Sequence, residues 1–454
     1  MRIRETLFVL VVAGAGCADR TIATVTPVQG KVETKDIPSN PEKDVDILFL
    51  IDNSGSMEAE QQSLQANFPK FMQVLETLEG GAPNMHIGVA TSDMGQRASD
   101  GTATAAIAGC SGAGDDGALR TSPAINGRFI IDELVSGGGR NRNYTGTLGD
   151  AFSSIAGVGI DGCGVEQHLS AVERVLGNTA ANAGFVRPEA KLAVIVIADE
   201  DDCSLAHKGL WEGTVDGTSI NFRCTSSGIK CTDTPDLSKP GVRDDCVPND
   251  QSEYLEPVDR YVDFVKSLKK NPTDDVIVAG ILGKDKPFEI KLNDKGQPIL
   301  GPSCTYGGNQ TAVPALRTAD FLAQFTQRVQ TEICGADLSK AMVDIAVLLK
   351  RAFGDPCWEG EVADQDLDKD GLQADCQVTD VKVLPDGTRQ DVAVIAACGG
   401  GAIPCWRLEV DAAQCSYTTT HLKLVIDRGG VIPPSDIHVK ASCVTTAPND
   451  GPFM

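Results

Sequence analysis

The chain has 454 residues, more than one ordinary hydrophobic core accommodates, so two folded domains are expected. Hydrophobic residues make up 41% of the chain and charged residues 23%, a composition that excludes wholesale disorder. The formal net charge of −23 argues against nucleic acid and anionic lipid as partners, because their phosphates repel an acidic surface.

Residues 1–17 have the pattern of a secretory signal. Arg2 and Arg4 precede an apolar run from Leu7 to Ala13, and small residues follow this run. The run is too short to remain in a bilayer as a spanning helix. We therefore expect an exported protein.

The end of this segment resembles the lipobox of bacterial lipoproteins, in which a cysteine after small residues becomes the lipidated first residue. Cys17 stands at that place, whereas Gly14 replaces the aliphatic residue that the pattern prefers. Two alternatives follow. Either the chain is lipidated at Cys17 and contacts the outer membrane only through this anchor, or an ordinary signal peptidase removes the segment. Both place the protein at the cell envelope or cell surface.

The cysteines support export. There are 15 in the chain, and the 14 other than Cys17 are scattered, without the paired spacing of a zinc site. Paired thiols persist in oxidising compartments, so disulfides are predicted for these 14. Cys224 and Cys231 are close enough in sequence to close a small loop with each other.

The organisation predicted after residues 1–17 has three parts. Residues 18–43 are rich in Thr, Val, Pro, Lys and Glu and are interpreted as a tether that lifts a domain off a membrane. Residues 44–355 are interpreted as the main domain, with two loop regions, at 95–145 and 203–250, pinned by disulfides. Residues 356–454 are cysteine-rich and contain short alternating apolar runs, which predict a small, mostly β domain.

The main domain alternates apolar strands with amphipathic helices. This alternation predicts an α/β fold, with a doubly wound, mainly parallel sheet of Rossmann-like type. In such sheets ligands bind at the carboxyl ends of the strands. The strands are predicted at 45–51, 85–90, 192–198 and 276–282, and the helices at 64–78, 165–176, 258–268 and 338–349.

The strongest motif directly follows the first strand, in the stretch DILFLIDNSGSM. Asp52 stands at the carboxyl end of the strand, with Ser54 and Ser56 in a turn that leads into a helix. One carboxylate and two hydroxyls are hard oxygen ligands of the kind that Mg²⁺ or Ca²⁺ prefers. The alternative is an ordinary strand-to-helix turn that these side chains cap.

This stretch closely resembles the von Willebrand factor A (vWA) family, in which DxSxS after the first strand begins a metal-ion-dependent adhesion site. The resemblance covers about residues 44–353. It implies a Mg²⁺ ion, or Mn²⁺ or Ca²⁺ in its place, whose open position accepts an acidic residue of a protein ligand. The family's site also uses an Asp at the end of a later strand, and Asp199 matches it, although Glu200 stands where the family usually has Gly.

The chain departs from the family at a third element, a Thr on a loop before a helix. The matching stretch at 161–164 contains no Thr, and Thr145 and Thr147 lie much earlier. If that ligand is missing, the affinity for metal falls.

A second cation candidate lies in the C-terminal part. Asp366, Asp368 and Asp370 match positions 1, 3 and 5 of an EF-hand calcium loop, and Asp375 follows. Gln377 replaces the bidentate Glu at position 12, and no helical pattern flanks the loop. The stretch is therefore a possible Ca²⁺ loop or an acidic solvent loop.

The sequence contains none of the HExxH, GxSxG and P-loop patterns. The sequence therefore predicts a surface-anchored vWA-type adhesion protein, not an enzyme, which binds a protein ligand through a divalent metal. The alternatives are an exported scaffold protein without a functional metal and an accessory subunit of a surface enzyme.

Overall fold

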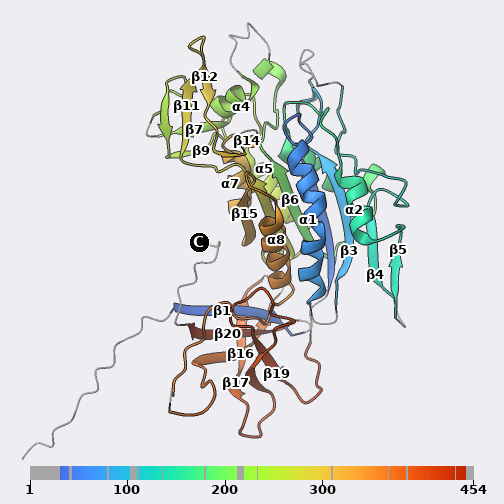
Figure 1. Cartoon of the computed structure of the whole chain (residues 1–454), viewed down its shortest axis with the longest axis vertical. Helices are drawn as coiled ribbons and strands as arrows, with labels where there is room; N and C mark the ends of the chain where they lie inside the picture. Colours follow the sequence, from blue (N-terminus) through green and yellow to red (C-terminus); the bar gives the residue numbers. More distant parts are fainter. Residues whose placement is uncertain are drawn as a thin grey trace, which may run out of the picture.

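The computed structural model describes residues 31–39, 43–78, 81–102, 110, 112–135, 138–177, 180–211, 219–232, 234–307, 310–366, 368–384, 387–434 and 436–445. The expected signal segment and its lipidation candidate Cys17 lie outside these residues. The described chain forms an α/β domain and, at one end of it, a β domain (Figure 1).

A seven-stranded, mainly parallel sheet forms the centre of the α/β domain. Its strand order is β15-β10-β6-β2-β3-β4-β5. The five parallel strands are β2 (Asp44–Ile51), β3 (Asn84–Thr91), β6 (Lys191–Ala198), β10 (Val276–Leu282) and β15 (Gln327–Glu332). Antiparallel β4 (Ile130–Leu134) and β5 (Arg140–Arg142) complete one side. The central strands are continuous apolar runs because both of their faces are buried.

Helices cover both faces of this sheet (Figure 1). On one face lie α1 (Glu58–Glu76), α2 (Leu148–Ala156) and α8 (Ser339–Ala352), and on the other α3 (His168–Leu176), α5 (Val258–Ser267) and α7 (Leu316–Ala323). Alternate residues of β2 pack into the two hydrophobic cores, one on each face of the sheet. Phe49 packs with the aromatic rings of α1 and α2, whereas Leu48 packs toward α3 and α5. The α/β class expected from the sequence is present.

The structure corrects the start of one predicted helix. The helix predicted at 165–176 begins at His168, because Asp202 accepts a hydrogen bond from the backbone N–H of Leu169 at 2.9 Å. Glu166 therefore lies on the preceding loop.

The two intervals expected to be loops contain short regular elements. The first includes β4 and β5. The second includes α4 (Ile220–Gly228), β7 (Ile229–Cys231), β8 (Gly241–Arg243) and β9 (Cys246–Pro248). Further along the chain lie α6 (Pro272–Asp275), β11 (Phe288–Leu292), β12 (Pro298–Leu300), β13 (Cys304–Tyr306) and β14 (Gln310–Ala312). Most of these elements are too short for their apolar periodicity to be read from sequence.

The β domain is a six-stranded sheet that includes a strand from the start of the chain. The strand order is β1-β20-β16-β17-β18-β19. The strands are β1 (Lys31–Pro38), β16 (Cys376–Val383), β17 (Arg389–Ala397), β18 (Cys405–Val410), β19 (Leu422–Asp427) and β20 (Ile437–Thr445). The core of this domain contains Trp358 and Trp406.

The prediction that residues 18–43 form a tether is therefore wrong for residues 31–38, which form strand β1. β1 pairs with β20 along its whole length, from Lys31 opposite Thr445 to Pro38 opposite His438. The error has a physical cause. Backbone pairing and a polar contact hold β1, since the buried Glu33 accepts hydrogen bonds from the backbone N–H groups of Glu359 and Gly360. No apolar alternation marks such a strand.

Seven disulfides join the 14 cysteines other than Cys17. Cys224 and Cys231 do not bond to each other, contrary to the expectation from their spacing. The pairs are Cys110–Cys163, Cys203–Cys224, Cys231–Cys246, Cys304–Cys334, Cys357–Cys415, Cys376–Cys443 and Cys398–Cys405. So many disulfides indicate an exported protein. Among the described helices, none has both the length and the apolar character that crossing a membrane requires.

Candidate metal centre

Asp52 lies where β2 ends, beside the end of β6. Its backbone N–H donates to the carbonyl of Ile197 at 2.9 Å and so continues the pairing of the two strands. The Asp52 side chain is fully buried, and its Oδ1 accepts a hydrogen bond from the N–H of Ser54 at 2.7 Å. The hydroxyls of Ser54 and Ser56 lie 3.2 Å apart in the turn before α1. The motif residues are thus gathered at one edge of the sheet.

Asp199 follows β6 at the same edge and is 5% exposed. Burial, and then the charge of Glu200, raise the pKa of Asp199 to about 7, while a hydrogen bond from Ser56 opposes this shift. Burial, and then the charge of Asp199, raise the pKa of Asp52. The structure therefore brings together the four site residues named from the sequence.

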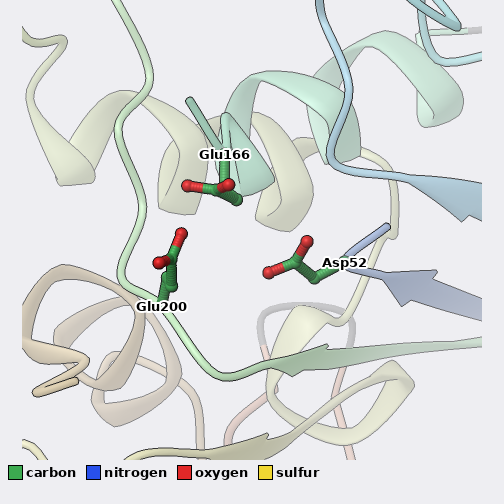
Figure 2. Close-up of side chains that lie close together, drawn as sticks. All are labelled: Asp52, Glu166 and Glu200. Atoms are coloured by element: carbon green, nitrogen blue, oxygen red, sulfur yellow. The ribbon is translucent and has the colours of Figure 1, made fainter. Parts of the chain in front are cut away.

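Two further carboxyls, which the sequence motif does not include, meet Asp52 here. Oxygens of Asp52, Glu166 and Glu200 all lie within 4.8 Å of one another. Figure 2 shows the three carboxyl groups turned toward one another. Within the described residues, no other cluster of His, Cys, Asp and Glu meets this distance criterion.

Glu166 lies just after the stretch where the resemblance to the vWA family predicted a Thr. Disulfide Cys110–Cys163 anchors its loop, and the N–H of Gly162 donates to the carbonyl of Asn53 at 2.9 Å. The backbone carbonyl of Glu166 accepts a hydrogen bond from the N–H of Cys203 at 2.7 Å. The loop thus fixes an acidic side chain near the place where a hydroxyl was expected.

The earlier Thr candidate has a structural role. The hydroxyl of Thr147 caps α2 by accepting from the N–H of Asp150 at 3.1 Å, and the Asp150 side chain bonds back to Thr147. This reciprocal capping occupies the Thr147 side chain.

The electrostatics of the cluster favour a cation. Burial, followed by repulsion from neighbouring carboxyls, raises the pKa of Asp52 and of Glu166 well above their usual values. Several buried polar atoms at this edge also have no hydrogen-bond partner among the described residues: Asp52 Oδ2, Asn53 Oδ1, Glu60 Oε2, Ser92 Oγ, Glu166 Oε1 and Asp199 Oδ1. Asp52 Oδ2 and Glu166 Oε1 belong to carboxyls of the three-residue cluster, and such unpartnered oxygens fit a divalent cation, which prefers oxygen ligands.

The rest of the acidic run positions the site. Asp201 accepts hydrogen bonds from the N–H groups of Arg317 and Thr318, at 2.9 and 3.0 Å, where α7 begins. Asp202 binds the guanidinium of Arg317 at 3.0 Å, and both side chains are fully buried. These contacts hold the segment that carries Asp199 and Glu200.

The possible calcium loop at 364–375 does not gather its carboxyls. Asp366 pairs with Lys369 at 2.7 Å, and Asp375 accepts a hydrogen bond from Gln365. In the described part of this loop, Asp366, Asp368, Asp370 and Asp375 form no group of three within 4.8 Å. Calcium binding there stays a prediction.

Comparisons with known proteins give distant structural matches only. No family model matches the chain, and no curated protein matches it. A von Willebrand factor type A protein from Catenulispora acidiphila matches with a TM-score of 0.28 and 11% identity over 92% of this chain. The pilus adhesin RrgA from Streptococcus pneumoniae matches with a TM-score of 0.28 and 12% identity over 91% of this chain. Three N-terminal domains of the type V pili tip protein Mfa5 from Porphyromonas gingivalis match with a TM-score of 0.27 and 10% identity over 91% of this chain.

The chain covers 66%, 57% and 68% of the lengths of these three structures, respectively. Every TM-score is below 0.5, so these likenesses assign no function to the chain.

Proposed function

We propose that the chain is an exported binding protein with a vWA-type α/β domain, which engages a protein partner through a divalent cation. The observation that carries this proposal is the meeting of Asp52, Glu166 and Glu200, with unpartnered buried oxygens, at the carboxyl edge of the sheet. That edge is where ligands bind in α/β sheets.

In this proposal Asp52, Ser54, Ser56 and Asp199 line the cation's site together with Glu166 and Glu200. Not all six bind the cation directly, so one position stays open for the partner. Mg²⁺ is the first candidate, with Mn²⁺ and Ca²⁺ as alternatives. The bound cation would supply a site that attracts an oxygen atom of the partner. The turn after β2 and the loop around Glu166 keep these side chains in place, so that little ordering is needed on binding.

We also propose that lipid on Cys17 anchors the protein at the outer membrane. The seven disulfides support export, and the lipobox-like end of residues 1–17 supports the anchor. We propose a binding role and no enzymatic one.

A binding screen with and without EDTA tests the partner-binding claim. We expect a surface-protein partner to be retained by the wild type only when a divalent cation is present, and not by Asp52→Ala. Asp368→Ala, a matched change in the C-terminal acidic loop, should behave as the wild type. Retention of the partner in EDTA, or equal retention by Asp52→Ala, would support a scaffold role without a functional metal.

A further inference from the structure

The carboxyls around the candidate metal centre outnumber the charges of a divalent cation. Asp52, Glu166 and Glu200 meet at one point, and Asp199 lies beside them. Once a cation holds these carboxyls ionised, the first three alone leave the loaded site with a net negative charge. A hydroxyl in place of Glu166, as the resemblance implies, would make the net charge of the loaded site less negative by one unit.

The described surroundings do not offset this charge. The neighbouring side chains that shift the pKa of Asp52, Glu166 and Asp199 most are carboxyls and serine hydroxyls, with no Lys or Arg among them. Arg317, the guanidinium held near this segment, is fully buried and already paired with Asp202. The net charge of the centre therefore remains negative.

Glu166 cannot leave the centre easily. Its side chain is 2% exposed, and its backbone is bonded to Cys203 and to the loop anchored by Cys163. The exposed Asp161 lies on the same loop, so the nearby surface adds a further negative charge.

We propose that Glu166 determines which group this centre accepts: a neutral oxygen donor of the partner, an amide carbonyl or a hydroxyl, and no carboxylate. The inference rests on the proposed function, because it requires a bound cation. An incoming carboxylate meets three or more negative charges at short range, and their repulsion offsets its attraction to the cation. A neutral oxygen keeps the attraction without that repulsion. This assignment differs from the acidic ligand residue that the resemblance to the vWA family implies.

The test uses the full chain loaded with Mn²⁺, whose bound water is followed by water-proton relaxation. Acetate is added as the carboxylate probe, and acetamide as its neutral counterpart. In the wild type we expect acetate to leave the relaxation enhancement unchanged at concentrations where acetamide lowers it. In Glu166→Thr we expect acetate to displace water, with an affinity raised at least about tenfold by the removal of one nearby unit charge.

Two controls separate charge from folding. Glu166→Gln removes the charge and keeps the shape, and it should admit acetate as Glu166→Thr does. Glu173→Gln removes the same charge on the outer side of α3, where Glu173 pairs with Arg260, and should exclude acetate as the wild type does. Displacement of water by acetate in wild type and variants alike overturns this inference but leaves the proposed cation site standing. Absence of protein-bound Mn²⁺ in the wild type overturns both.

Discussion

Asp199 links the candidate metal centre to the stability of the protein. Its pKa is raised to about 7 from an ordinary value of 3.8, so between these pH values the folded chain keeps a proton that the unfolded chain has lost. The free energy of unfolding of the metal-free protein therefore falls as pH rises through this window. Each unit of pKa shift corresponds to about 1.4 kcal/mol at full effect.

We expect Asp199→Asn to flatten this dependence in part, because Asp52 and Glu166 contribute slopes of the same sign. Urea denaturation in EDTA, repeated across this pH window, measures how the free energy of unfolding depends on pH. The same slope in Asp199→Asn and in the wild type would show that burial does not raise this pKa.

The buried pair of Asp202 and Arg317 gives a second prediction at this scale. Arg317→Ala leaves the fully buried Asp202 carboxylate without its cationic partner, which should lower the free energy of unfolding by about 3–5 kcal/mol. Arg260→Ala breaks a half-exposed pair with Glu173 and should cost at most about 1 kcal/mol. Chemical denaturation compares the two variants. Equal losses would mean that the buried pair does not stabilise this segment.

Asp52, Ser54, Ser56 and Asp199 could be named from the sequence because each directly follows a continuous apolar strand or belongs to a compact motif. Glu166 could not. The apolar positions from Val165 onward match a helix, and the contact from Asp202 that starts the helix later comes from a distant part of the chain. One signal was present: a carboxyl close after the stretch that lacks the expected Thr.

At the scale of elements, the loop between α2 and α3 depends on a disulfide for its position. Cys110–Cys163 ends three residues before Glu166. Replacing both cysteines by Ser should weaken cation affinity about tenfold or more, a usual effect of losing the support of a metal ligand. The matched control replaces Cys398 and Cys405, which pair within the β domain. Calorimetric titration measures the cation affinity of both double variants. Equal affinities in the two would argue against a positioning role for Cys110–Cys163.

The apolar runs of β2, β6 and β10 predicted their strands, because burial on both faces demands continuous hydrophobic residues. Short strands such as β7 and β9 escaped prediction. Their pairing depends on the Cys231–Cys246 bridge between them, and sequence does not reveal that partner.

At the scale of the whole molecule, the chain begins and ends its described course in the same sheet. β1 and β20 lie side by side, and the chain passes through the entire α/β domain between them. The β domain is therefore discontinuous in sequence. The change in cysteine content predicts a boundary at 356, whereas the sequence gives no signal for the first strand, which lies in a polar segment.

We expect a fragment of residues 356–445 to be much less stable than the same fragment with 31–39 attached after Thr445 through an Asn-Gly turn. Such a turn suits the antiparallel pairing of Lys31 with Thr445. Thermal denaturation followed by circular dichroism compares the two. Equal melting temperatures would show that β1 contributes little to the domain.

Cation binding at the edge of the large sheet is the central claim, and thermal denaturation with and without metal tests it most directly. A ligand that binds only the folded state stabilises it by about 2.7 kcal/mol at roughly a hundred times its Kd. We predict that Mg²⁺ or Mn²⁺ raises the melting temperature of the wild type and of Asp368→Ala, and that Asp52→Ala abolishes the rise. No rise in the wild type at millimolar metal, or an unchanged rise in Asp52→Ala, would contradict the account.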